Sequence, residues 1–233
     1  MLLKGSRVTI RPLNRADLSA MAAWRPFDDP LLADANWLQR APDGLNRWYT
    51  RSREDPRRLL FALLDGSERT VGLLTLREVD GLCSARLGIT LGADFVNQGY
   101  GTEALVLFLD HFFGELGFEK MLLDVAAHNE RAICVYKKLG FKTVGQRKRA
   151  PAREMSLGFL RDSRYADMRR FFPRDWIGRR RVLCYEMMLT QKDWKKRKND
   201  DDRSRALGRR AQVGTGQDGE QSRRIRQRDN ARS

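Results

Sequence analysis

Three apolar runs in the middle of the chain constrain its fold more than any other feature. They lie at 58–65, 70–80 and 83–91, and an Asp-Gly pair, at 65–66 and at 80–81, marks the end of each of the first two. An Asp-Gly pair between hydrophobic runs is a strong hairpin signal, because glycine adopts the positive φ that a tight turn needs. The runs therefore predict a meander of three antiparallel strands.

The second half of the chain alternates strands with helices. Apolar residues of 102–113 recur three and four positions apart, which predicts a helix with one buried face. A strand at 121–127, a helix at 129–139 and strands at 141–149 and 182–190 follow. Mixed periods of this kind are typical of an α/β domain.

The region before the meander predicts one strand and two helices. Alternation at 7–13 indicates a half-buried strand, and Asn14 offers a cap for the helix that follows it. A second helix is expected around 45–54. The prolines between Pro26 and Pro42 predict a mobile connection between the two helices.

The chain is strongly basic, and half of its excess charge lies in one segment. Lys and Arg number 45 against 30 Asp and Glu, which gives a net charge of +15. Residues 191–233 hold 14 of the basic and 7 of the acidic residues and few hydrophobic ones, which predicts a disordered charged tail. Such a tail could make weak contact with RNA or the ribosome, or could serve only solubility.

Cysteine usage and hydropathy limit the compartment. Cys83, Cys134 and Cys184 form an odd, unpatterned set that fits neither a disulfide framework nor a zinc site. No apolar run approaches the ~20 residues of a membrane span, and the first residues lack a signal-peptide core. We therefore expect a cytoplasmic protein with no membrane association.

Two glycines mark a candidate anion site at a strand-to-helix junction. The segment NQGYGTEAL, 97–105, carries Gly99 and Gly101 just before the helix. The glycines allow a sharp turn that points amide N–H groups into one concavity at the positive end of the helix dipole, where a pyrophosphate would bind. A glycine-containing helix start without any ligand is the alternative.

Asp124, Asn129 and Tyr136 form a second constellation. On a strand, Asp124 would face away from Leu123 and could look into a cleft. Asn129 would cap the next helix, and Tyr136 lies two turns further on the same face. An exposed acid, an ordinary cap and a half-buried aromatic are the alternatives.

Together these motifs resemble the GCN5-related N-acetyltransferase (GNAT) superfamily. The likeness rests on a GxG loop followed by TEAL, a strand, and then N-x-x-A-I-x-x-Y-x-x-L-G-F at 129–141. The opening IRPL with an Asp-containing helix resembles the branch that acetylates ribosomal-protein N-termini. The resemblance implies a mixed, mostly antiparallel sheet flanked by helices, which splays beside the cofactor loop in a domain spanning 1–190.

The resemblance also assigns roles to individual residues. Loop amides would hold the acetyl-CoA pyrophosphate, and the pantetheine arm would pair with 87–91 like an extra strand. Tyr136 would protonate the departing CoA thiolate, and Asp124 would act as the general base. No metal is implied. The implied cofactor-binding residues are Leu87, Gly88, Ile89, Thr90, Leu91, Val96, Asn97, Gln98, Gly99, Tyr100, Gly101, Thr102, Asn129 and Tyr136.

Three positions or segments depart from the family pattern. Val96 stands where Gln or Arg usually begins the loop, so one side-chain contact to phosphate is missing. Arg86 occupies a position that carries Glu in many members, which removes a base at that site. The segment 150–181 is an arginine-rich insertion, either a loop that shapes the substrate site or a solvated hairpin.

The resemblance implies acetyl transfer from acetyl-CoA to an amine by direct attack. A protein N-terminus, an aminoglycoside and another small amine all remain open as acceptors, whereas a basic body argues against a polyamine. The alternative is an inactive protein of the same fold that binds RNA or the ribosome, or that senses acetyl-CoA. A homodimer is a further expectation.

Overall fold

The fold is seen in a computed structural model, which describes residues 1–39, 42–153 and 155–203. The chain forms two compact units, Met1–Gln191 and Lys192–Ser233. Residues 191–203 are helical, whereas the sequence predicted disorder there. The remainder of the predicted tail, 204–233, lies outside the described residues, so its contact with RNA or the ribosome stays a prediction.

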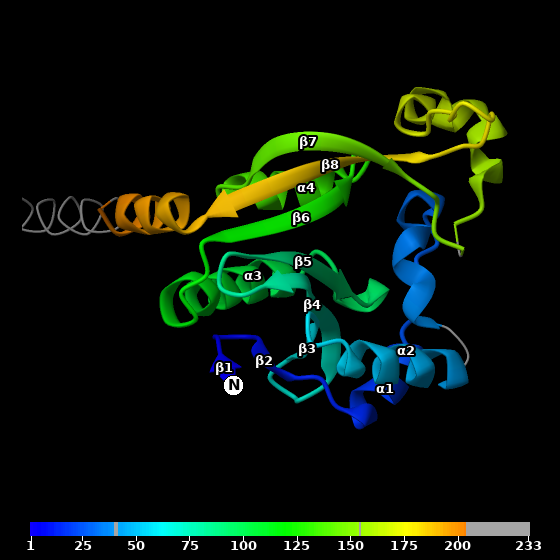
Figure 1. The fold of residues 1–233 in the computed structure, drawn as a ribbon. Coiled ribbons are helices and arrows are strands. Elements are labelled where there is room, and N and C mark those ends of the chain that lie inside the picture. Colours follow the sequence, from blue (N-terminus) through cyan, green and yellow to red (C-terminus); the bar gives the residue numbers. More distant parts are fainter. Residues whose placement is uncertain (40–41, 154, 204–233) are drawn as a thin grey trace, which may run out of the picture. The chain divides into compact units, whose positions relative to one another are not determined.

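Eight strands of the first unit form one sheet within the described residues (Figure 1). Their order is β1-β2-β3-β4-β5-β6-β8-β7, and only β5 and β6 pair in parallel. The predicted mixed, mostly antiparallel sheet is therefore confirmed. The strands are β1 (Leu3–Lys4), β2 (Thr9–Pro12), β3 (Leu59–Leu64), β4 (Thr70–Asp80), β5 (Ser84–Leu91), β6 (Lys120–Ala126), β7 (Lys142–Arg149) and β8 (Val182–Thr190).

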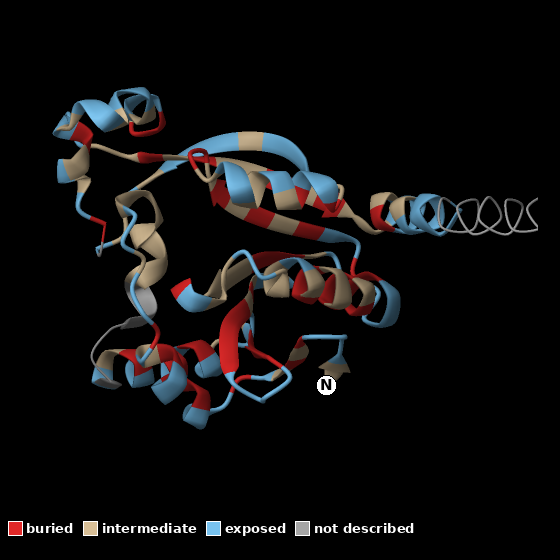
Figure 2. Cartoon of the chain, turned by 180° about the vertical axis from the view of Figure 1, so that it is seen from behind, coloured by how far each residue is buried: buried red, intermediate tan, exposed pale blue. Residues whose placement is uncertain are grey.

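Helices cover both faces of the sheet. Leu60, Ala62 and Leu64 of β3 belong to a core cluster with residues of α1 (Arg15–Ala22) and α2 (Pro42–Glu54). Phe61, between them, packs on α3 (Tyr100–Asp110), with its ring centroid 5.3 Å from that of Phe108. Because successive side chains of a strand point to opposite faces, β3 is apolar along its whole length. Figure 2 shows buried residues along the central strands and an exposed edge at β7.

A buried carboxylate joins α1 to the sheet. Asn14 caps α1 as predicted, in a reciprocal capping box with Asp17. The guanidinium of Arg11 donates two hydrogen bonds to the same carboxylate, at 2.7 and 2.8 Å, and the Thr70 hydroxyl donates a third at 3.0 Å. Asp17 therefore ties the helix start to β2 and β4.

Two segments are more ordered than the sequence predicted. The connection expected to be mobile contains a 3-10 helix, η1 (Pro30–Gln39). The insertion at 150–181 contains two further 3-10 helices, η4 (Leu157–Arg161) and η5 (Ser163–Phe171), whose apolar residues form a small core against β8. A π-helical turn, η3 (His111–Glu115), extends α3, η2 (Ala93–Phe95) precedes it, and α4 spans Glu130–Lys138. None of the described helices is long and apolar enough to cross a membrane.

Candidate active site

The central strands β5 and β6 part halfway along their length. They pair only from Ser84–Leu87 to Lys120–Leu123. Beyond that point β5 continues on β4 to Leu91, and β6 continues on β8 to Ala126. The edges at 88–91 and 124–126 therefore face one another without pairing, and their backbone groups are available to an extended ligand.

The glycine loop opens onto the same gap. Gly99 precedes α3 with φ +85°, in the left-handed region, and no side chain caps the helix. The first amide groups of an α-helix have no partner inside the helix, so they can bind an anion together with the helix dipole. The loop thus has the geometry of a phosphate site.

Arg7 holds this loop from outside. Its Nη1 donates to the carbonyl of Gln98 at 2.9 Å, and its Nε lies 2.9 Å from a carboxylate oxygen of Glu103. A Cβ on Gly99 would meet Arg7 Nη2 at 2.6 Å. Glycine is needed there for its positive φ and for the close approach of Arg7.

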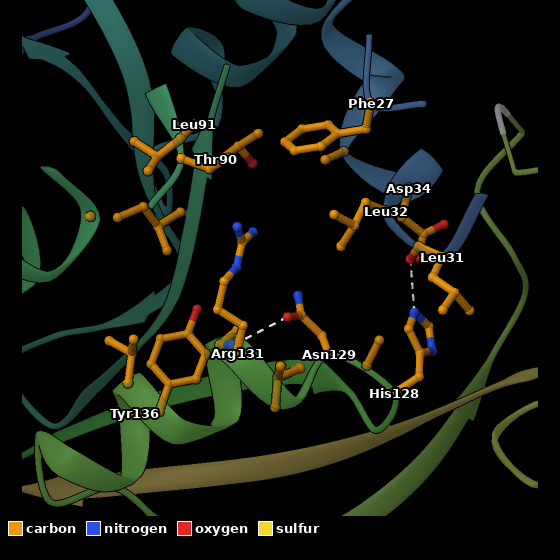
Figure 3. Close-up of a pocket in the computed structure, with 18 of the residues that line it drawn as sticks. Phe27, Leu31, Leu32, Asp34, Thr90, Leu91, His128, Asn129, Arg131 and Tyr136 are labelled. Carbon is orange, nitrogen blue, oxygen red and sulfur yellow. Dashed lines mark hydrogen bonds between the residues drawn. The ribbon is translucent and has the colours of Figure 1, made fainter. Parts of the chain in front are cut away.

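A cavity of about 340 Å³ lies between the loop, the parted strands, α4 and η1 (Figure 3). Most of the residues that the sequence singled out line it. Leu87 and Gly88 line a neighbouring cavity instead, and Gln98 and Tyr100 line neither of these two. Those in the first cavity are Ile89, Thr90, Leu91, Val96, Asn97, Gly99, Gly101, Thr102, Asp124, Asn129 and Tyr136.

Tyr136 comes from α4, with its hydroxyl directed into the cavity (Figure 3). The ring is buried and packs edge-on against Phe141, with centroids 5.7 Å apart. Burial raises the pKa of Tyr136 to about 12. The hydroxyl therefore stays protonated at neutral pH and can donate a proton or a hydrogen bond.

Asn129 caps α4, as the sequence predicted, and also faces the cavity. Its Oδ1 accepts a hydrogen bond from the Ala132 amide at 3.1 Å. The side chain lies beside that of Arg131, which extends into the cavity from the same helix (Figure 3). Both side chains carry N–H donors, so this wall suits a ligand rich in acceptor oxygens.

Asp124 lies on β6 just past the last pair with β5. Its Oδ2 is 3.1 Å from Nη1 of Arg86 and 2.5 Å from Nη2 of Arg147. Its Oδ1 is buried and has no hydrogen-bond partner among the described residues. One carboxylate oxygen is thus fixed by two cations, while the other is a buried acceptor without a hydrogen-bond partner among the described residues.

A second cavity, of about 510 Å³, lies on the side of α2 and β4 and meets the first at the gap. Arg58, Arg77 and Arg153 line it but not the first cavity. The two cavities have six lining residues in common, and these surround their junction: Asp34, Ile89, Thr90, Asp124, Tyr136 and Arg149. An elongated ligand in the first cavity could therefore meet a second ligand beside Tyr136 and Asp124.

Sequence reasoning missed the wall that η1 and His128 build. Asp34 pairs with Arg149 of β7, and His128 Nε2 lies 2.9 Å from the Leu31 carbonyl oxygen. His128 is buried and stacks on Phe172, with ring centroids 5.1 Å apart. Burial lowers its pKa. Neither η1 nor the insertion has a clear hydrophobic period, so no local sequence pattern predicts the contacts that these segments make.

The described residues contain no group of three or more His, Cys, Asp or Glu placed to hold a metal ion.

In sequence, the chain is 25% identical over 178 residues to a spermidine N(1)-acetyltransferase of Vibrio cholerae, covering 72% of this chain and 92% of that protein. A spermidine N(1)-acetyltransferase of Escherichia coli K12 is 29% identical over 150 residues, with 60% and 75% covered.

Solved structures have the same fold. The spermidine N-acetyltransferase of V. cholerae in complex with CoA and spermine matches with a TM-score of 0.60 at 20% identity, covering 82% of this chain and 99% of that one. A GNAT-family acetyltransferase of Bacillus anthracis matches with a TM-score of 0.57 at 14% identity, covering 82% and 99%. Residues 7–142 match the acetyltransferase (GNAT) domain, which is more than half of the chain. The chain therefore belongs to the GNAT family of N-acetyltransferases.

Proposed function

We propose that Tyr136 and Asp124 carry the transfer of an acetyl group from acetyl-CoA to a primary amine. The observation that carries this proposal is their position at the junction of two cavities, one beside the glycine loop and one on the side of α2 and β4. A donor in the first cavity and an acceptor in the second would meet there. Among the described residues, neither Oδ1 of Asp124 nor the hydroxyl of Tyr136 has a hydrogen-bond partner.

The residues present fit acetyl-CoA in the first cavity. The uncapped start of α3 and the donors of Asn129 and Arg131 suit its phosphates, and the unpaired edge of β5 suits its extended pantetheine arm. Bound acetyl-CoA supplies an activated acyl group as a thioester. The loop, the strand edge and α4 orient this group toward the second cavity.

The two side chains divide the proton transfers. Oδ1 of Asp124 accepts a hydrogen bond from the acceptor amine and takes its proton directly or through a water. The amine nitrogen forms a bond to the thioester carbon, and the carbon–sulfur bond breaks as the tetrahedral intermediate collapses. Tyr136 donates its proton to the thiolate and regains one from solvent, while Asp124 releases the amine proton to solvent. A neutral amine and acetyl-CoA therefore give an amide and CoA with no net proton.

The acceptor is a primary amine in this proposal. The relatives from V. cholerae and E. coli are named for spermidine, which is a small-molecule amine. The resemblance of the first residues to acetyltransferases of ribosomal proteins favours a protein N-terminus instead. Both classes react by the same attack, so both belong in the first assay.

Two measurements test the function. One is the melting temperature in the presence of CoA, and the other is the consumption of acetyl-CoA in the presence of a panel of amines. A ligand at 100 times its dissociation constant adds about 2.7 kcal/mol to the free energy of unfolding, so saturating CoA should raise the melting temperature. Acetyl-CoA should be consumed when a substrate amine is present. Unchanged melting in CoA, together with no consumption for any amine, would overturn the proposal.

A further inference from the structure

The charged side chains around the gap form a row that crosses five strands of the sheet. Arg77 of β4 lies directly opposite Arg86 of β5, and Asp124 of β6 lies directly opposite Glu186 of β8. Arg86 pairs with Glu186 at 2.9 Å and with Asp124 at 3.1 Å. Arg147 of β7 completes the row at Asp124. Arg86 also pairs with Glu78 at 2.8 Å. Each acid of the row is therefore held by Arg86 or Arg147, whereas Arg77 at the end of the row pairs with none of them.

Arg77 is an unpartnered cation on the wall of the second cavity. It makes no hydrogen bond or ion pair with another described residue, and it is half-buried. Leu73 and Thr75, which share its face of β4, line the same cavity. Burial lowers the pKa of Arg77, while Asp124 and Glu78 act in the opposite direction. A guanidinium withdrawn from water in this way is stabilised by an anion.

Two more arginines face the same space. Arg153, at the start of the insertion, is exposed and has no partner among the described residues. Arg58 lies 3.2 Å from Asp55, an acid that does not line this cavity. The second cavity thus receives cations from β4, from the insertion and from the segment that precedes β3.

The carboxylates of this cavity are already engaged. Asp34 pairs with Arg149 and also accepts a hydrogen bond from the Ala152 amide at 3.1 Å. Asp124 has only Oδ1 open, which the proposed reaction uses for the attacking amine. Among the described residues that line the cavity, no carboxylate remains for a second ammonium group, so the cavity does not complement a polycation.

We infer that the acceptor is a small amine that also carries a carboxylate or phosphate group. Its oxyanion would bind Arg77 and Arg153, while its amine would reach Oδ1 of Asp124 at the gap. Guanidinium groups bind both kinds of oxyanion through paired hydrogen bonds, and about 510 Å³ is a volume typical of small-molecule sites. This inference rests on the proposed function and narrows its substrate class.

Matched pairs of amines test the inference with the full chain. β-Alanine is compared with its amide, β-alaninamide, and O-phosphoethanolamine with ethanolamine, while spermidine represents the polycations. The oxyanion member of at least one pair should have a kcat/KM about tenfold or more above its neutral partner, as expected for a charged hydrogen bond. The pair that responds separates a carboxylate acceptor from a phosphate acceptor.

Variants that change the charge of the second cavity then show which arginines cause the preference for an oxyanion. Arg77→Gln should remove the advantage of the oxyanion, and Arg77→Glu should shift selectivity toward spermidine. Arg153→Gln, at an exposed position, provides a second variant if the half-buried position does not tolerate change. Arg53→Gln, an exposed arginine of α2 outside the cavity, should keep the preference of the unchanged chain.

The outcomes separate this inference from the proposed function. Equal or better turnover of neutral amines or spermidine, with selectivity unaffected by Arg77→Gln, overturns the inference and leaves acetyl transfer standing. If no amine turns over, calorimetry still tests the inference, because it measures the binding of the same amines in saturating CoA. Binding of an oxyanion amine that Arg77→Gln abolishes supports the inference, and equal binding within both pairs overturns it.

Discussion

Arg86 of β5 holds the carboxylate of Asp124 on β6, with Nη1 3.1 Å from Oδ2. Both side chains are largely buried, with 11% and 8% of their surface exposed. The contact lies at the point where the two strands stop pairing, so it fixes the carboxylate at the opening of the gap. Arg86, which stands where many family members carry Glu, thus positions Asp124, the carboxylate to which the family resemblance assigns the role of general base.

Loss of Arg86 should destabilise the fold. Arg86→Gln would leave Glu78 and Glu186 without this cation and Asp124 with Arg147 alone, so the free energy of unfolding should fall by about 1–3 kcal/mol. Urea unfolding measures this loss in the free energy of unfolding. Arg53→Gln, on the exposed surface of α2, should change it by less than about 0.5 kcal/mol. Equal stability of the two variants would show that the cluster contributes little.

Removal of the Tyr136 hydroxyl should slow turnover more than it weakens CoA binding. Tyr136→Phe keeps the buried ring and removes only the proton donor, so kcat should fall by about 10²–10⁴-fold with nearly unchanged CoA affinity. Tyr49→Phe is a matched control, because that hydroxyl donates to the Leu13 carbonyl at 3.3 Å and the residue lines neither cavity. A Tyr136→Phe enzyme with full kcat would assign the proton transfer to water.

Local sequence patterns predicted the frame of the site. Alternation and helical spacing located the central strands and α3, and the cap at Asn129 located the start of α4. These signals are local, because they depend on periods of two and 3.6 residues within one element. They placed Asp124, Asn129 and Tyr136 on their elements, and the structure brings all three residues to one cavity.

Contacts between distant segments could not be predicted in the same way. The Arg7 contact with the loop joins residues that are more than 90 positions apart, and the pair of Asp34 with Arg149 spans 115. Neither arginine differs in sequence pattern from its many basic neighbours. The unpartnered state of Arg77 likewise follows only from the register that places Arg86 opposite it.

Asp17 should make stability depend on acidic pH. Burial would raise the pKa of Asp17, but hydrogen bonds from Arg11, Asn14 and Thr70 outweigh it and lower the pKa below its ordinary value. Its contribution is therefore present above the unfolded pKa of about 4 and is lost as pH falls through the lower folded pKa. The stability difference between the unchanged chain and Asp17→Asn should shrink below pH ~4. Urea unfolding at pH 7, 5 and 3 checks this, with the exposed Asp43→Asn as control.

Arg131 should bind the phosphates of the donor in place of the side chain that Val96 lacks. Its Nη1 donates to Oδ1 of Asn97 at 3.1 Å, which holds the cation beside the loop and within the first cavity. Arg131→Gln should therefore raise the dissociation constant of CoA about tenfold, with a smaller effect on kcat.

The donor can be varied to locate this effect. Acetyl-pantetheine lacks the pyrophosphate and the nucleotide, so its kcat/KM should be the same in Arg131→Gln as in the unchanged chain. Lys137→Gln, an exposed cation on the same helix outside the cavity, controls for net charge. If Arg131→Gln lowers kcat/KM equally for acetyl-CoA and acetyl-pantetheine, the residue acts on the reacting end of the site, and the phosphate role is wrong.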